Sequence, residues 1–263
     1  HIEADAFLID FLQTKFRLKE MKRAFTNWQN KLNGRAWNTL YIENHDHPRI
    51  ISRYGNEKYR VQSGKMLANM YMLQQGTPFV YQGQELGMLN TRLGSIDDYV
   101  DCFVKNNYDV AINKLHMNKE KAFEFAVKST RDNSRTPVQW DDSKNAGFTT
   151  GTPWLSVNGN YPRINVAEQE NAPNSVLAYY RQLIAFRNGS EILQAGDFSE
   201  LYRKDGVYAY RRSLNVESII VVISLSTKER PNPVSGTVVL SNYGRQESPA
   251  CLSPYEALIL REV

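Results

Sequence analysis

A short strand, a helix and a second short strand follow one another between residues 37 and 81, and this order limits the possible folds more than any other feature of the sequence. Trp37–Glu43 and Thr77–Tyr81 are brief runs of aromatic and β-branched residues that end in polar residues, as buried strands do. The helix is predicted over Tyr59–Gln75, and Gly76 ends it. Because a helical crossover returns the chain to the same edge, we expect the strands to pair in parallel.

Helical spacing of apolar residues also predicts helices over Arg17–Leu32 and Ser175–Asn188, with helical character near Asn106–Lys128. Residues 86–170 otherwise form a long, turn-rich excursion. Loops of that length are uncommon in compact domains unless they shape a binding site.

After Gly196 the apolar residues alternate instead of following the helical period. Short strands are predicted at Val207–Arg211, Ser218–Leu225, Thr237–Leu240 and Ala257–Leu260. The change of period favours an α/β domain over residues 1–192 followed by a small antiparallel β-sandwich domain over residues 193–263.

Composition and charge exclude several classes of protein. The 263 residues are 41% hydrophobic and 23% charged, which is typical of a folded globular chain and not of a disordered one. The net charge of +4 is spread along the sequence without a basic stripe, so we expect no nucleic-acid partner. Cys102 and Cys251 have no zinc-type spacing, and no apolar run approaches the roughly 20 residues of a membrane helix.

The tripeptide Asn44-His45-Asp46 lies at the carboxyl end of the first predicted strand, the edge where α/β and barrel folds place their ligand sites. Taken alone, it allows a second interpretation. Asp46 would cap the next helix, and His45 would be a packed, hydrogen-bonded core residue.

Motifs around and after this tripeptide resemble a known family. They are Tyr41-Ile-Glu-Asn-His-Asp-His-Pro-Arg-Ile-Ile-Ser-Arg-Tyr-Gly, Gly76-Thr-Pro-Phe-Val-Tyr-Gln-Gly-Gln-Glu-Leu-Gly-Met, Arg131-Asp-Asn-Ser-Arg-Thr-Pro-Val-Gln-Trp, Asn145-Ala-Gly-Phe-Thr and Ile164-Asn-Val. The first resembles the fourth conserved segment of the α-amylase clan of retaining glycosidases. Their order and spacing are similar to the oligo-1,6-glucosidase, maltase and isomaltase branch.

The resemblance implies the C-terminal part of a (β/α)8 TIM barrel, with strands seven and eight, followed by the β-sandwich. The nucleophilic Asp and the general-acid Glu of the family would then lie upstream of His1, in a missing N-terminal half of the barrel. The implied activity of the parent protein is that of a retaining, exo-acting α-glucosidase that hydrolyses α-1,4 or α-1,6 bonds in short oligosaccharides such as maltose or isomaltose. The fragment alone is expected to be inactive.

The resemblance also implies roles for three residues. Asp46 is the transition-state stabiliser, a third carboxylate that accepts hydrogen bonds from the sugar while positive charge develops on its ring. His45 and Arg135 bind the substrate, and the guanidinium of Arg135 offers a planar fork of donors for hydroxyl and carboxylate groups. A structural salt bridge within the loop is the alternative for Arg135, and Arg131 and Asp132 are expected to pin that loop.

Two departures from the branch bear on specificity. Relatives usually place a Glu after the acidic residue that follows strand eight, where this chain has Asp101-Cys102-Phe103. Sucrose isomerases carry an Arg-rich segment where this chain has Lys15-Phe-Arg-Leu-Lys-Glu. The alternatives that remain open are a transglucosidase, a sucrose isomerase or a non-catalytic accessory subunit.

The same resemblance implies partners and cofactors. We expect an oligosaccharide substrate, the missing half of the barrel, no membrane partner and a cytoplasmic location. No cofactor or metal is expected in this segment, while calcium is an option for the missing N-terminal part.

Overall fold

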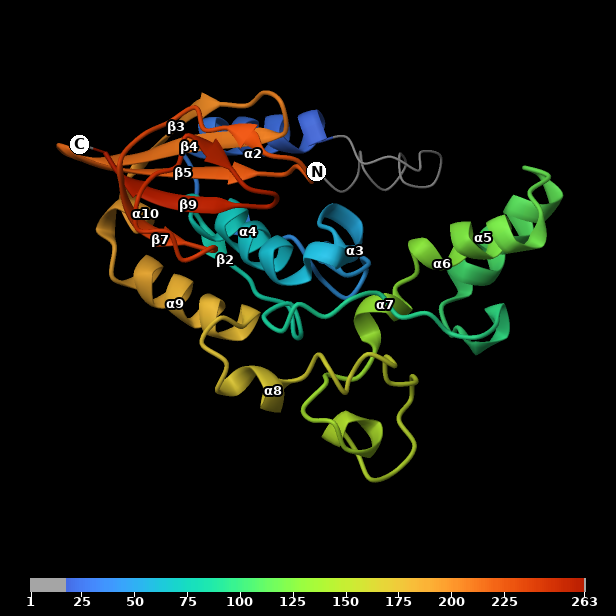
Figure 1. The fold of residues 1–263 in the computed structure, drawn as a ribbon. Helices are drawn as coiled ribbons and strands as arrows, with labels where there is room; N and C mark the ends of the chain where they lie inside the picture. The colour runs from blue at the N-terminus through green and yellow to red at the C-terminus, as the bar shows by residue number, and fades with distance from the viewer. Residues whose placement is uncertain (1–17, 263) are drawn as a thin grey trace. The chain divides into compact units, whose positions relative to one another are not determined.

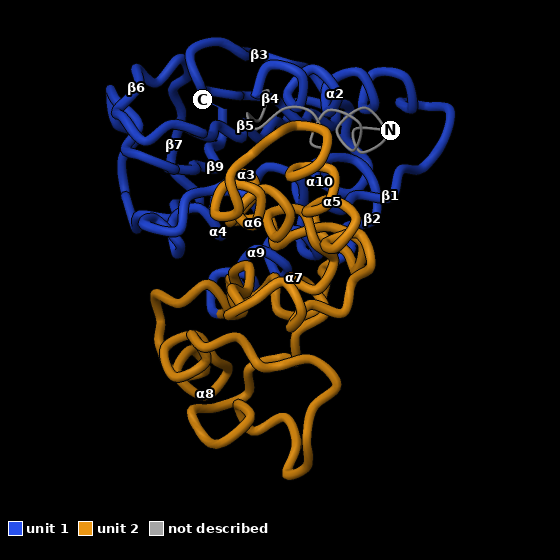
Figure 2. Tube along the Cα trace, turned by 90° about the vertical axis from the view of Figure 1, so that its right-hand side faces the viewer, with its two compact units in different colours: residues 1–42, 55–79, 178–263 blue, residues 43–54, 80–177 orange. Residues whose placement is uncertain are grey.

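The computed structural model describes residues 18–262, which form two compact units (Figure 2). The first unit combines Gly55–Phe79 with the chain before Glu43 and from Ala178 onward. The second consists of Glu43–Tyr54 and Val80–Leu177. The units interleave along the sequence, so they do not test the domain boundary predicted at residues 192 and 193, which stays a prediction.

The described residues contain helices at every predicted position, together with four short α-helices that the sequence did not predict. The α-helices are α2 (Leu18–Leu32), α3 (Ile50–Tyr54), α4 (Arg60–Met72), α5 (Cys102–Asn113), α6 (Lys119–Lys128), α7 (Asp132–Arg135), α8 (Val166–Glu170), α9 (Val176–Asn188) and α10 (Glu191–Ala195). Arg17, the predicted start of the first helix, lies outside the described residues. The helical stretch predicted near 106–128 is two helices, because the chain turns between them and His116 takes a φ of 52°.

The two predicted parallel strands are present but short. β1 (Thr39–Leu40) and β2 (Thr77–Pro78) pair in parallel, and the ladder is closed by bonds of 2.8 Å from Thr77 N to Asn38 O and from Phe79 N to Leu40 O. Pro78, between these two donors, has no N–H of its own. Within residues 18–262 the parallel ladder is confined to β1 and β2 and forms no closed barrel.

Gly76 makes the tight entry into β2 possible. Its φ of 139° is in the region that favours glycine, and a Cβ there would lie 2.6 Å from the carbonyl oxygen of Asn38. Any side chain would therefore push β1 and β2 apart.

The alternating segment after Gly196 forms an antiparallel sheet. Its strands and those of a small ladder are β3 (Asp197–Tyr202), β4 (Val207–Leu214), β5 (Glu217–Ser224), β6 (Arg230–Pro231), β7 (Thr237–Ser241), β8 (Cys251–Leu252) and β9 (Ala257–Arg261). The sheet has five strands in the order β3-β4-β5-β9-β7, and β6 pairs with β8 separately. β3 was not predicted, because a register shift between Glu200 and Tyr202 breaks the alternation of inward and outward side chains along the strand.

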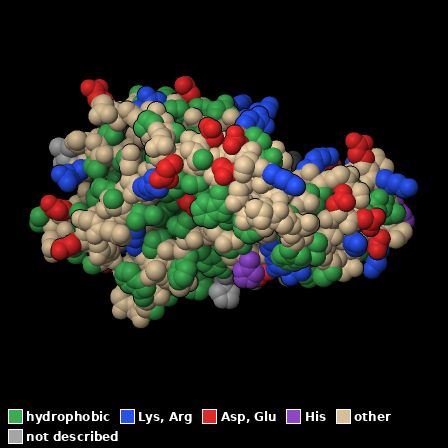
Figure 3. Space-filling view, turned by 90° about the horizontal axis from the view of Figure 1, so that it is seen from below, with side chains coloured by type: hydrophobic (Ala, Val, Ile, Leu, Met, Phe, Trp, Pro, Cys, Tyr) green, Lys and Arg blue, Asp and Glu red, His purple; other side chains and the backbone are tan. Residues whose placement is uncertain are grey.

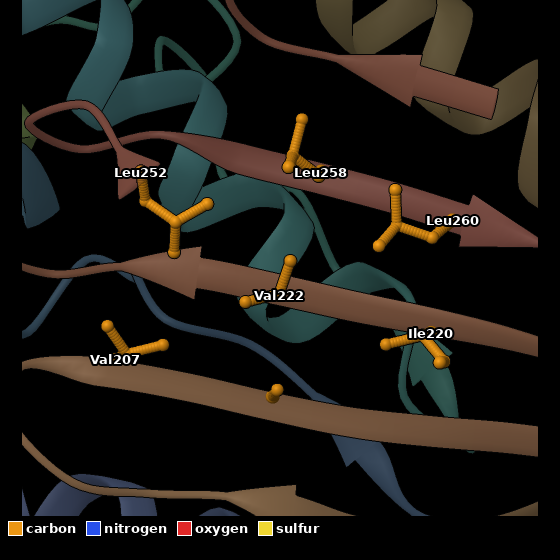
Figure 4. Close-up of a cluster of buried hydrophobic side chains, with 7 residues drawn as sticks. Val207, Ile220, Val222, Leu252, Leu258 and Leu260 are labelled. Atoms are coloured by element: carbon orange, nitrogen blue, oxygen red, sulfur yellow. The ribbon is translucent and has the colours of Figure 1, made fainter. Parts of the chain in front are cut away.

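One face of the sheet carries an apolar cluster (Figure 4). Its members are buried residues of β4, β5, β8 and β9, namely Val207, Ala209, Ile220, Val222, Leu252, Leu258 and Leu260. Leu252 comes from the β6–β8 ladder, so this ladder helps to cover that face. Burial of each such leucine or isoleucine side chain stabilises the fold by about 1.5–3 kcal/mol.

The opposite face of the sheet packs on helices of the same unit, with α4 running beneath β5 and β9 (Figure 1). Tyr210 of β4 donates from its hydroxyl to Asn69 O of α4 at 3.1 Å. Fully buried Arg212 donates to Leu73 O at 2.9 Å and Leu193 O at 3.0 Å. Desolvation lowers the pKa of Arg212 to about 10. Helices and sheet therefore share one core, which explains why the central strands are buried on both faces.

The second unit contains two smaller apolar clusters. Tyr99, Val104, Ala126 and Val127 join α5 to α6. Leu86, Met88 and Ile164 form the other cluster, in irregular chain. Most of this unit is loops and short helices, and it holds the predicted site residues.

Candidate active site

The polar segment after β1 folds into a side-chain-supported turn. Asn44 Oδ1 accepts a hydrogen bond from the backbone N–H of Asp46 at 2.8 Å, which is the Asx type of turn. The turn leaves the His45 side chain 66% exposed and the Asp46 side chain 50% exposed. Both side chains are thus free to meet a ligand from solvent.

Arg135 joins this turn from a distant part of the sequence. It is the last residue of α7, and its NH2 lies 3.0 Å from Asp46 Oδ1, a separation of 89 positions along the chain. Its Nε donates to His45 O at 2.8 Å, and His45 Nε2 lies 3.2 Å from Asp46 Oδ2. The three residues singled out from the sequence therefore form one cluster.

The structure bears differently on the three alternatives considered from the sequence. The helix that follows Asp46 is α3, and the backbone N–H of its first residue, Ile50, donates to Glu43 Oε2 at 3.1 Å, not to Asp46. The His45 side chain is exposed in the described part of the chain. Arg135 does make a salt bridge, with Asp46 as its partner, so this geometry is also consistent with the structural alternative for Arg135.

A buried ion pair flanks the turn and was not recognised from the sequence. Arg49 NH1 lies 2.6 Å from Glu43 Oε1, with side chains 0% and 1% exposed. Burial raises the pKa of Glu43, and the charge and hydrogen bond of Arg49 offset part of that effect. The signal available in the sequence was a pair of opposite charges on either side of Asn44-His45-Asp46, one of them ending an apolar strand.

A second ion pair fixes the loop that carries Arg135. Arg131 NH2 lies 2.7 Å from Asp101 Oδ1, and Arg131 N donates to Asp101 Oδ2 at 2.9 Å. Asp132 Oδ2 accepts from Val100 N at 2.8 Å. These contacts confirm that Arg131 and Asp132 pin the loop.

Asp101 has no freedom to contact a sugar in this arrangement. Its carboxylate is 1% exposed and also accepts from Phe103 N at 3.2 Å, capping α5. Desolvation raises its pKa, but the hydrogen bonds from Arg131 and Phe103 outweigh that effect, so the pKa is lowered overall. In the segment Asp101-Cys102-Phe103, where relatives usually place a Glu, the carboxylate of Asp101 thus holds the loop together.

Three further features of the described part of the chain concern metal ligands, membrane-spanning helices and the distribution of charge. Residues 18–262 contain no group of three His, Cys, Asp or Glu side chains that could hold a metal ion. No helix described there is both long and apolar enough to cross a membrane. On the face drawn in Figure 3, Lys and Arg side chains are interspersed with Asp and Glu side chains.

The chemistry open to the cluster follows from its charges. Asp46 is an exposed carboxylate held by a guanidinium on one oxygen and an imidazole on the other. Such a carboxylate can accept hydrogen bonds from hydroxyl groups and stabilise nearby positive charge. The cluster has one carboxylate, whereas retaining glycoside hydrolysis needs a further pair.

Comparisons with known proteins point to a single family. The family described as "Alpha amylase, catalytic domain" matches residues 3–196. The oligo-1,6-glucosidase of Parageobacillus thermoglucosidasius is 41% identical over 257 residues, covering 93% of this chain and 46% of that protein. The trehalose-6-phosphate hydrolase of Bacillus subtilis is 37% identical and covers 94% of this chain.

Solved structures lead to the same family. The crystal structure of Bacillus licheniformis trehalose-6-phosphate hydrolase superimposes with a TM-score of 0.88 at 36% identity, covering 94% of this chain and 47% of that one. An isomaltulose synthase mutant from Erwinia rhapontici gives a TM-score of 0.85 at 35% identity, with the same coverage of both chains. The chain therefore spans about half the length of the relatives it matches, and it belongs to the alpha-amylase family, whose catalytic domain it matches over residues 3–196.

Proposed function

We propose that this chain is the C-terminal part of a retaining, exo-acting α-glucosidase that hydrolyses α-1,4 or α-1,6 bonds in short oligosaccharides such as maltose or isomaltose. The observation that carries the proposal is the exposed Asp46 carboxylate, held by Arg135 and His45. Relatives named oligo-1,6-glucosidase, which share 37–41% identity with the chain, support the choice of substrate class.

Each residue of the cluster has a role in this proposal. Asp46 accepts hydrogen bonds from the sugar at the cleaved position, and these strengthen as the ring flattens toward an oxocarbenium ion. Arg135 orients the Asp46 carboxylate, and its remaining donors face the sugar hydroxyls. His45 binds the same sugar. Asp46 transfers no proton, because the nucleophile and the general acid belong to the missing half of the barrel.

The proposal extends to the architecture and surroundings of the complete protein. The parallel pair β1 and β2 represents strands seven and eight of a (β/α)8 barrel, and the antiparallel sheet with its β6–β8 ladder represents the β-sandwich. The N-terminal half of the barrel is then an obligatory partner of this chain. That this segment binds no cofactor and that the protein is cytoplasmic stay predictions.

Substrate profiling of the full-length protein that carries this segment tests the proposal. Glucose release from maltose and isomaltose is measured beside trehalose 6-phosphate and sucrose, with product analysis for isomaltulose and for transfer products. Hydrolysis of maltose or isomaltose supports the α-glucosidase. Dominant sucrose isomerisation or glucosyl transfer favours the alternative enzymes, and a protein inert on all four sugars favours an accessory subunit. The isolated chain should be inactive on p-nitrophenyl α-glucoside.

A further inference from the structure

Arg49 is a fully buried cation next to the candidate site. Its side chain is 0% exposed, and it forms an ion pair with the carboxylate of Glu43. Removing an ion from water costs several kcal/mol, and a well-packed apolar pair often stabilises a fold at least as well as a buried ion pair. The energetics of the pair therefore leave room for a role other than stability.

The guanidinium of Arg49 connects three segments of the second unit. Its NH1 donates to Glu43 Oε1 at 2.6 Å and to Gln82 O at 2.7 Å. Its NH2 lies 3.4 Å from Ser134 O. Among the described residues, no acceptor reaches its buried Nε. An arginine that served only to neutralise Glu43 could bond both carboxylate oxygens with its two-pronged fork. Arg49 instead divides its donors between Glu43 and the two carbonyl groups, so these carbonyls contribute to its orientation.

The contact with Ser134 leads directly to the candidate site. Ser134 precedes Arg135, and its carbonyl also accepts from the Tyr81 hydroxyl at 3.1 Å. Its own hydroxyl donates to His47 O at 2.6 Å, and His47 follows Asp46. The neighbours of Asp46 and of Arg135 are therefore bonded to each other and to the segment after β2.

We propose that Arg49 is a positioning residue that sets the distance between Asp46 and Arg135, and thereby the orientation of the carboxylate toward the sugar. The proposal rests on the α-glucosidase function proposed above. Arg49 does not contact substrate and acts through Ser134. A displacement of about 1 Å in such a site can lower a rate by about 100-fold, so small shifts of Ser134 have measurable consequences.

The first test is Arg49→Lys in the full-length protein. Lysine keeps the charge that Glu43 requires but lacks the planar fork that reaches Gln82 O and Ser134 O together. We expect kcat on p-nitrophenyl α-glucoside to fall about 30-fold, with KM changing less than about threefold. Unfolding temperature should shift by only a few degrees.

Arg92→Lys is the matched control. It alters an arginine of the same unit whose partner is the exposed Glu124 of α6. We expect its kcat to stay within about threefold of wild type. Equal losses in the two variants would overturn the proposal.

A double-mutant cycle separates positioning from a general loss of structure. Combining Arg49→Lys with Arg135→Lys should give little further loss beyond that of Arg49→Lys, the larger of the two single losses, because both changes disturb the same geometry. Losses in kcat that multiply would show independent effects and overturn the proposal. Ser134→Ala is the second variant if Arg49→Lys folds poorly. It keeps the carbonyl that Arg49 contacts and removes the hydroxyl bond to His47 O, through which Ser134 is linked to the Asp46 segment. It should lower kcat about fivefold, and an unchanged kcat would contradict the proposal.

Crystal structures of the full-length wild type and of Arg49→Lys give a readout that does not depend on activity. We expect the Arg135 NH2–Asp46 Oδ1 distance, 3.0 Å here, to lengthen beyond hydrogen-bonding range in the variant. An unchanged distance overturns the positioning role, whether or not the protein hydrolyses a glucoside. If the distance lengthens in the variant while the wild type is inert on glucosides, the proposed function alone is contradicted.

Discussion

The antiparallel sheet of the first unit and the site of the second are held together by different forces. The sheet is stabilised by apolar side chains such as Val222 and Leu258 that are buried on regular strands. The site depends on polar bonds between loops and short helices, among them Arg49 to Glu43 and Arg135 to Asp46. Apolar burial is roughly proportional to area and tolerates exchange, whereas a polar cluster depends on particular atoms. Changes in the sheet should therefore affect stability, and changes in the site should affect activity.

The largest expected effect comes from Asp46→Asn in the full-length protein. The variant keeps the shape of the side chain but removes the charge that faces the developing positive ring. Turnover should fall about 1,000-fold, with little change in unfolding temperature because the side chain is 50% exposed. Steady-state kinetics and calorimetry measure the two quantities. Turnover within a factor of three of wild type would contradict the role assigned to Asp46.

The opposite pattern is expected for Leu258→Ala on β9. Its side chain is fully buried in the apolar cluster of the sheet, so truncation should lower the free energy of unfolding by about 3 kcal/mol. The kcat per folded molecule should not change. Denaturant titration measures the effect, with the partly exposed Val239→Ala as control. Similar destabilisation in both variants would mean that the sheet core is not where the structure places it.

Arg135→Lys should have a smaller effect on activity than Asp46→Asn. The charge near Asp46 survives, but lysine cannot bond Asp46 Oδ1 and His45 O in the same geometry. We expect kcat/KM to fall about tenfold while folding persists. Arg163→Lys changes an exposed arginine of the same unit and serves as control. Unchanged efficiency would indicate a purely structural salt bridge.

The smallest effect is a pH dependence at Asp101. Its pKa in the folded protein is below the usual 3.8, so the ionised carboxylate stabilises the fold above that pH and the contribution is lost as the pH falls through the lowered pKa. Asp101→Asn should cost about 1 kcal/mol at neutral pH. The difference in unfolding temperature between wild type and variant should narrow below about pH 3.8. A difference that is constant from pH 7 to pH 3 would exclude this linkage.

Features with a local signal were predicted well. Apolar spacing located α4 and α9, and the short apolar runs before Asn44 and Gln82 located the parallel strands. Alternation located β4, β5, β7 and β9. These patterns are visible because each residue's environment depends on its position within one element.

Features that depend on distant parts of the chain were missed. β3 contains a bulge that breaks its alternation, and the break between α5 and α6 depends on the left-handed conformation of His116. The pair of Glu43 and Arg49 was missed because charged residues are almost never fully buried unless they are paired, and nothing local in the sequence shows that these two residues pair. The other contacts of Arg49, with Gln82 and Ser134, come from distant segments. The roles of Asp46, His45 and Arg135 came from family resemblance, while the structure shows only that they lie together.

Pro78 has a consequence for how the chain behaves during synthesis. Thr77 and Phe79 direct their N–H groups toward β1, so the nitrogen of the residue between them faces the outer edge of β2. With proline there, that edge lacks a donor at its centre, and a strand from another molecule would lose one bond in pairing with it. The outer edge of β2 therefore has a reduced tendency to pair with strands of other newly made chains.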